Sequence, residues 1–192
     1  MNGSLWPAER FAIDFVQLDE QGRLPDAGEN LQSWHYYGTD ILAAAQGRVV
    51  EVIDGMPDQV PGQESPGLTI DELGGNHVII DMGEGRFALY GHMIPGSIVV
   101  EKGQFVRAGE KLGRLGNSGS STAPHLHFHI MDRPHPLQSV GLPFVFDRTT
   151  FQGHVVEIFN EIDSSGMPVI DDSARGNRSR QMPLALDIVG FR

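Results

Sequence analysis

Short apolar runs that end at glycine-containing turns recur along the chain. The segment "GRVVEVIDG" (47–55) is a β-branched run ending at Asp-Gly, and "NHVIIDMGEGRFALYGHM" (76–93) places two apolar runs around Gly83, Glu84 and Gly85. This spacing predicts strands, and in the second segment a β-hairpin. The chain has 24 Gly and 12 Pro and no long stretch with the helical period. Short connections without helices between them favour an all-β fold, with an antiparallel sheet or barrel.

The segments "FAIDFVQL" (11–18) and "SIVVEKGQFVRAGEKLGRLG" (97–116) predict further strands of the same sheet. The stretch rich in Pro and Gly at 56–67 predicts a long surface loop. "GNSGSSTAP" (116–124) could suggest a phosphate-binding loop, but it leads into a strand and not a helix. We therefore interpret it as a tight turn.

The last part of the chain has a different pattern. "GHVVEIF" (153–159) and "LALDIVGF" (184–191) predict two more strands, and "DDSARGNRSR" (171–180) between them has the composition of a mobile polar loop. We expect a core of residues 1–147 followed by a C-terminal β extension of residues 148–192.

Composition excludes several classes of function. The net charge of -11 argues against nucleic acid as a ligand, because phosphate binding requires a basic surface. The chain has no cysteine, so any metal must be held by His, Asp, Glu or water. No segment approaches the ~20 apolar residues of a membrane span. The first residues lack the basic start and apolar run of a signal peptide, so we expect a soluble chain without its own export signal.

Three histidines alternate in "STAPHLHFHIMD" (121–132): His125, His127 and His129. Alternate residues of a strand share one face of the sheet. Residues two apart lie about 6.6 Å from each other, within reach of one metal ion, but residues four apart lie about 13 Å from each other. His125 and His129 therefore cannot both bind the same ion.

Together with "NHVIIDMGEGRFALYGHM", these histidine-containing residues resemble the core of the lysostaphin-type zinc metallopeptidases, the glycyl-glycine endopeptidase family that cuts peptide bridges and stems of bacterial peptidoglycan. The resemblance runs from about Phe11 to Asp132. It implies a small antiparallel β-sheet protein. It also implies a zinc ion held by the His and Asp of an H-x-x-x-D motif and by the second His of H-x-H, with two further histidines beside the reacting water.

The resemblance implies a role for four residues of this chain. Asp14 in "RFAID" and His127 match zinc ligands, while His92 in "YGH" and His125 in "HLH" match the two catalytic histidines. The sequence supports Asp14 independently, because a carboxylate inside the apolar strand "AIDF" would be costly to bury without a cation. Tyr90, two residues before His92, is expected to present its hydroxyl on the same face.

The first ligand of the motif is replaced here by Arg10, whose guanidinium has no lone pair for zinc. The family's glycine at the middle of the motif is Ala12, and in a regular strand Arg10 and Asp14 would lie about 13 Å apart. The third protein ligand is therefore not identified. His129 is either a substitute ligand or, as we prefer, a hydrogen-bonding partner of one, and His35 is the competing donor. His77, His135 and His154 are interpreted as structural or surface groups.

The function implied is zinc-dependent hydrolysis of peptide bonds, with a peptide of peptidoglycan cross-links or stems as the partner. Zn²⁺ with an open position makes hydroxide available near neutral pH. The loop at 56–67 and the turn at 116–124 would form the walls of the peptide groove. If the substrate is the cell wall, we expect the protein to act outside the cytoplasm.

Three other kinds of protein share features of this sequence. A cupin places its H-x-H pair before its lone histidine, whereas His92 precedes His125 here. A biotinyl or lipoyl carrier needs its acceptor lysine at an exposed turn, and Lys111 lies inside the run "AGEKLG". The alternative that stays open is an inactive member of the same fold that serves as a binding or activator module, because Arg10 breaks the metal motif.

Overall fold

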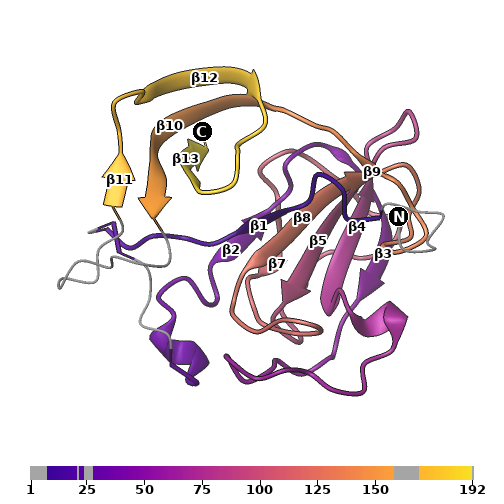
Figure 1. Cartoon of the computed structure of the whole chain (residues 1–192). Helices are drawn as coiled ribbons and strands as arrows, with labels where there is room; N and C mark the ends of the chain where they lie inside the picture. The colour runs from indigo at the N-terminus through magenta and orange to yellow at the C-terminus, as the bar shows by residue number, and fades with distance from the viewer. Residues whose placement is uncertain (1–7, 21, 24–27, 158–168, 192) are drawn as a thin grey trace. The chain divides into compact units, whose positions relative to one another are not determined.

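A computed structural model of the 192-residue chain describes residues 8–20, 22–23, 28–157 and 169–191. These residues form thirteen strands and two single-turn 3-10 helices, with no α-helix among them (Figure 1). The elements are β1 (Ile13–Phe15), η1 (Leu31–Ser33), β2 (Asp40–Leu42), β3 (Gly47–Ile53), η2 (Ile70–Glu72), β4 (Asn76–Asp81), β5 (Phe87–Met93), β6 (Phe105–Val106), β7 (Lys111–Arg114), β8 (Leu126–Met131), β9 (Gly141–Leu142), β10 (Phe146–Glu157), β11 (Val169–Asp171), β12 (Gly176–Gln181) and β13 (Asp187–Phe191). The paired strands are antiparallel, which confirms the predicted all-β antiparallel fold.

The chain divides into two compact units. The first comprises the described residues within 1–16 and 26–143, and the second those within 17–25 and 144–192. The second unit begins near the predicted boundary at residue 147 and also takes in the segment 17–25, which the sequence did not indicate. The division into a core of residues 1–147 and a C-terminal β extension of residues 148–192 stays a prediction.

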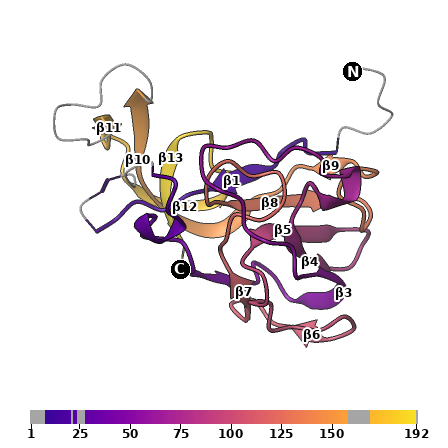
Figure 2. The same ribbon diagram turned by 90° about the horizontal axis from the view of Figure 1, so that it is seen from below.

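The first unit is built on a seven-stranded sheet with the order β1-β8-β5-β4-β3-β6, and β9 pairs with β8. The succession from β8 through β5 and β4 to β3 can be followed in Figure 2. Strands β1 and β6 end this order, so of the two predicted alternatives the described strands form the open antiparallel sheet and not a barrel. Strands β2 and β7 form a separate pair within the same unit.

The hairpin predicted from the glycines is confirmed. Strands β4 and β5 pair through Ile79 and Leu89, and the chain turns at Gly83, Glu84 and Gly85. All three turn residues have positive φ, between 55° and 84°. Glycine adopts this left-handed conformation without steric cost, which explains why two of the three are glycine.

One face of the seven-stranded sheet is the hydrophobic core. Its side chains are at most 5% exposed, and they include Val49, Val78, Ile80, Ala88, Tyr90, Phe128 and Ile130. On the opposite face, Ile79, Leu89 and Met131 form a smaller buried hydrophobic cluster. Because β4 is covered on both faces, nearly all of its residues are buried. The polar groups described below therefore stand on a rigid, well-packed sheet.

The second unit corrects one prediction. The segment 171–180, expected to be a mobile polar loop, contains most of β12, which pairs with β10 from Phe151↔Gly176 to Phe146↔Gln181. Backbone hydrogen bonds to β10 make this polar segment a strand, although its own composition favours a loop. Strands β11 and β13 also pair with β10, and the predicted strand at 184–191 corresponds to β13. Residues 158 and 159 of the other predicted strand lie outside the described residues.

Candidate active site

Strands β1 and β8 bring together two of the predicted site residues. Their antiparallel register places Asp14 opposite His127, and Asp14 Oδ1 lies 2.9 Å from His127 Nδ1. The same carboxylate oxygen lies 3.6 Å from His125 Nε2. The hydrogen bond from His127 is the main cause that lowers the pKa of Asp14. Asp14 is therefore ionised at neutral pH and available as an oxygen ligand.

His92 reaches the same face because the backbone departs from a regular strand at the end of β5. Alternation along β5 would place His92 on the face of Tyr90. Tyr90 lies in the core, where its hydroxyl accepts a hydrogen bond from the N–H of Ala44 (2.8 Å), so the expectation that it faces the site is wrong. His92 has φ 60°, a left-handed conformation that is uncommon outside glycine. This local turn brings its ring to His125 and His127.

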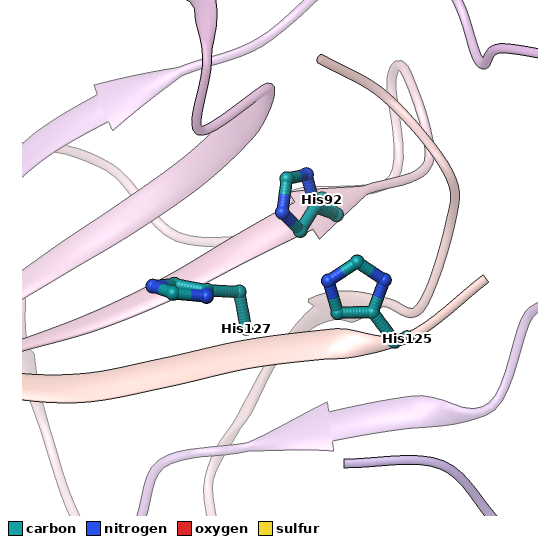
Figure 3. Close-up of side chains that lie close together, drawn as sticks. All are labelled: His92, His125 and His127. Atoms are coloured by element: carbon teal, nitrogen blue, oxygen red, sulfur yellow. The ribbon is translucent and has the colours of Figure 1, made fainter. Parts of the chain in front are cut away.

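The three histidine rings form one cluster. The ring of His92 is centred 4.5 Å from that of His125 and 5.9 Å from that of His127. One ring nitrogen from each residue lies within 4.8 Å of the others, which makes the three a possible metal-binding group. Figure 3 shows the His92 ring from β5 beside the rings of His125 and His127, which come from β8 and the residue before it.

Carbonyl oxygens determine which nitrogen of His92 and His125 carries the proton. His92 Nδ1 lies 2.7 Å from the carbonyl oxygen of Ser118, and His125 Nδ1 lies 2.8 Å from that of Ala123. A carbonyl only accepts, so each Nδ1 donates its N–H and each Nε2 keeps a lone pair. Burial lowers the pKa of His92 to about 3, so this ring is neutral at pH 7. Both residues can therefore accept a proton or donate a lone pair through Nε2.

His129 contacts the cluster from the side away from Asp14. Its Nδ1 lies 3.0 Å from His127 Nε2, while Asp14 is bound at the other nitrogen of His127. His129 is 1% exposed, and burial lowers its pKa to about 4. It thus contacts the His127 ring as a neutral hydrogen-bonding partner, and its role as a partner of a ligand stays a prediction.

Arg10 lies in a turn before β1 and is not one of the residues that line the site. The N–H of Ala12 donates to the carbonyl of Glu9 (3.1 Å), and Phe11 has φ 66°, so the chain bends at Arg10. The guanidinium lies 5.0 Å from the centre of the Phe11 ring and its side chain is exposed. Glu9, Ala12 and Asp14 do line the cavity. Glu9 therefore lines the cavity and Arg10 does not.

The site opens into a cavity of about 930 Å³ on one face of the sheet. The turn at 116–124 contributes Ser120, Ser121 and Thr122 to its wall, as expected, whereas the loop at 56–67 does not line it. His35 is also absent from the lining and packs edge-on against Tyr36. His35 is thus not near the histidine cluster in this cavity.

Sequence reasoning missed other groups in this cavity. His77 and His135, interpreted as structural or surface residues, both line it, and so does Glu51. The alternation of side chains along the strands could have indicated them. Glu51 and Ile53 are two apart on β3 and share a face, and Ile53 pairs with His77 on β4. This alternation could be used only once the pairing of β3 with β4 was known.

The donor set fits a zinc ion. Zinc prefers imidazole nitrogen and carboxylate oxygen at about 2.0–2.2 Å, so two ligands of one tetrahedral ion lie about 3.4 Å apart. The distances from Asp14 Oδ1 to His127 (2.9 Å) and His125 (3.6 Å) lie close to this value. Cluster and carboxylate together thus offer at least three donor atoms of the right chemistry.

The sequence profile of Peptidase family M23 matches residues 31–139. This match covers more than half of the chain and includes the three clustered histidines. The chain belongs to Peptidase family M23. Asp14 and Arg10 lie before the matched residues, so the family match does not bear on the change at Arg10.

Two relatives illustrate how far the likeness extends. The peptidoglycan DD-endopeptidase ShyA of Vibrio cholerae is 38% identical over 66 residues, which are 34% of this chain and 15% of that protein. An uncharacterized metalloprotease of Haemophilus influenzae is 32% identical over 108 residues, 55% of this chain and 19% of that protein. The chain thus spans less than a fifth of the length of either relative.

Solved structures of M23 proteins are also similar. The catalytic domain of a point mutant of the prophage-encoded M23 protein EnpA from Enterococcus faecalis is 25% identical, with a TM-score of 0.42, over 67% of this chain and 87% of that chain. The catalytic domain of lysostaphin from Staphylococcus simulans is 23% identical, with a TM-score of 0.41, over 70% of this chain and 92% of that chain. No helix among the described residues is long and apolar enough to span a membrane.

Proposed function

We propose that this M23 member is a zinc-dependent endopeptidase that hydrolyses peptide bonds of peptidoglycan. The observation that carries the proposal is the meeting of Asp14, His92, His125 and His127 in one cavity. The zinc ligands among them would be Asp14 and His127, through the oxygen and nitrogen that already face each other at 2.9 Å. Bound zinc would polarise the peptide carbonyl and favour ionisation of the attacking water.

His125 would be the general base. Its Nδ1–H is bound to the carbonyl of Ala123, which leaves the lone pair of Nε2 beside the carboxylate of Asp14. Nε2 can take a proton from the attacking water and return it to the leaving amine. His92 would orient the water by accepting a hydrogen bond at Nε2, because burial keeps it neutral and its Nδ1–H is bound to Ser118.

A third protein donor is needed, because catalytic zinc sites generally have three. We propose Glu9 as this donor. It lies in the turn that leads into β1, and it lines the cavity, as Asp14 does. His129 would not bind the ion, because it contacts the nitrogen of His127 away from Asp14. Its part would be to hold the His127 ring in position.

The substrate assignment rests on the relatives, which include two proteins named peptidoglycan DD-endopeptidases. A peptide fits the size of the cavity better than a single amino acid does, because the cavity is about 930 Å³. Peptidoglycan lies outside the cytoplasmic membrane, so this function would be exercised there.

The decisive test is metal content measured together with hydrolysis. Elemental mass spectrometry of the purified protein should find about one zinc per chain. The protein should also release new amino groups from purified peptidoglycan. Removal of zinc with a chelator should stop the reaction and added zinc should restore it. Hydrolysis that continues without metal would refute the proposal.

A second candidate function is a binding or activator module without catalysis. The observation that favours it is the position of Arg10, which has left the metal motif and packs on Phe11. Such a module would retain no zinc after reconstitution and would still bind peptidoglycan. Metal content therefore distinguishes the two functions before any substrate is known.

A further inference from the structure

A second polar group stands in the same cavity, away from the histidine cluster. It consists of His77 on β4 and Glu51 on β3, and both line the cavity. His77 Nε2 lies 4.0 Å from Glu51 Oε1, which is too long for a hydrogen bond. The side chain of His77 is 3% exposed, and its Nε2 is buried without a hydrogen-bond partner among the described residues. A buried polar atom in this state is costly unless something binds to it.

The protonation of His77 follows from its other nitrogen. His77 Nδ1 lies 2.8 Å from the carbonyl oxygen of Gly75, which can only accept, so Nδ1 carries the hydrogen. Burial lowers the pKa of His77 below its usual value, so the ring is neutral at pH 7. Its Nε2 is then a lone-pair acceptor facing a carboxylate, which is also an acceptor. The two groups cannot bind each other, and the buried Nε2 has no donor among the described residues, whereas the Glu51 carboxylate is partly exposed.

A single donor between them must offer at least two hydrogens. Two acceptors 4.0 Å apart can both be reached from one nitrogen at hydrogen-bond distances of about 2.8–2.9 Å. A primary ammonium has three hydrogens and a positive charge that complements Glu51. A metal ion fits less well, because the only group of three close donors among the described residues is His92, His125 and His127.

We propose that His77 and Glu51 form a binding site for a primary ammonium group of the peptide substrate, such as an unmodified lysine or other diamino-acid side chain. Ile53 lies next to His77 in the β3–β4 pairing and also lines the cavity, so it offers an apolar surface to the methylene groups of such a side chain. The assignment rests on the proposed function only in naming a peptide as the carrier of the ammonium.

The distance to the histidine cluster suits an extended peptide. His77 is on β4 and His127 is on β8, and β5 lies between these strands. Two strand spacings amount to about 10 Å. An extended peptide advances about 3.3 Å per residue, so the ammonium would belong to a side chain about three residues from the bond at the metal site.

The test compares two peptides that differ at one lysine amine, which is free and charged in one and acetylated in the other. The full-length protein, with the metal it carries, is titrated with a short lysine-containing peptide and with the same peptide acetylated on the lysine amine. The ¹⁵N resonances of the His77 ring are followed by NMR to give dissociation constants. We expect the free amine to bind about tenfold more tightly or better, and the His77 Nε2 resonance to move only with that peptide.

Two variants locate the effect. Glu51→Gln removes the charge from a partly exposed side chain with little change of shape, and it should bring the two affinities to within about twofold. Glu101→Gln, at an exposed residue outside the cavity lining, should leave the difference intact. Equal affinity of the unmodified protein for the two peptides would overturn the inference. A shift of the His77 Nε2 resonance during a zinc titration would also overturn it.

Hydrolysis of purified peptidoglycan, measured separately, distinguishes failure of the ammonium site from failure of the catalytic function. Discrimination by charge without any hydrolysis would leave the ammonium site standing and refute the catalytic function. Hydrolysis without discrimination by charge would do the reverse.

Discussion

Gly75→Ala should destabilise the protein because this glycine has both a left-handed backbone and no room for a side chain. Gly75 has φ 61°, and a Cβ placed there would overlap the carbonyl oxygen of Ser118 and lie 2.6 Å from its Oγ. A left-handed conformation costs a non-glycine residue about 1–2 kcal/mol. Relief of the close contacts should cost about 1–3 kcal/mol more, as overpacking does in cores. The expected loss of unfolding free energy is therefore about 2–5 kcal/mol.

The matched control is Gly83→Ala in the β4–β5 turn. Gly83 has φ 84° with nothing within 4 Å of its Cβ position, so it should lose only the backbone part, about 1–2 kcal/mol. Urea denaturation followed by circular dichroism gives both values, provided that the m-values stay equal. Equal losses for the two variants would show that Ser118 moves aside at no cost, and the argument from close contact would be refuted.

The same substitution should affect the site, because Ser118 holds His92. The carbonyl oxygen that a Gly75 side chain would displace accepts the hydrogen bond from His92 Nδ1. A shifted Ser118 would release the His92 ring from its orientation. Hydrolysis should fall in Gly75→Ala even at temperatures where the variant is fully folded, whereas Gly83→Ala should keep its activity.

Four further predictions address the metal and the titrating groups. His125→Ala should abolish hydrolysis while zinc content by elemental analysis stays near normal, whereas His127→Ala should lose the zinc; the opposite outcome would exchange their roles. In a competition titration, Glu9→Gln should weaken zinc affinity by orders of magnitude and His129→Ala by about 10–100-fold. The control Glu29→Gln, at an exposed residue outside the cavity lining, should leave the zinc affinity unchanged. Arg10→His should not raise zinc affinity, because the bend at Phe11 turns residue 10 away from the cavity, and a gain would show that this turn rearranges. The pKa of His77 is lower in the folded state, so as the pH drops below about 6.5 the unfolded state takes up a proton first and the free energy of unfolding should fall. This group should contribute a slope of at most about 1.4 kcal/mol per pH unit. Urea unfolding of His77→Gln at several pH values should show a shallower slope.

The β4–β5 hairpin and the alternation of the β8 histidines could be predicted from the sequence because both depend on local geometry. Gly83 and Gly85 adopt the positive φ that the turn requires, and residues two apart on a strand share a face whatever the rest of the fold does. The same rule predicts that His125 and His129 do not share one metal ion, and His129 is not in the possible metal-binding group of His92, His125 and His127. Glycine-rich turns and short apolar runs were sufficient for the all-β class.

Local rules failed where pairing or strain decides the outcome. Alternation along β5 predicts that Tyr90 and His92 share a face, but the left-handed φ of His92 turns its ring to the opposite one. The polar segment that contains β12 is a strand because β10 supplies its hydrogen bonds, and nothing within the segment itself indicates this.

Strand alternation and glycine-containing turns, which are properties of short segments, determined the class of the fold, and the resemblance to a known family supplied the four candidate residues. Only the tertiary structure decided that Arg10 leaves the cavity while Glu9 enters it, and that Glu51 and His77 stand 4.0 Å apart. The second fact depends on the pairing of β3 with β4, whereas the first depends on the turn before β1, where Phe11 has a positive φ. Long-range strand pairing sets the positions of Glu51 and His77, and no local pattern in the sequence carries that information.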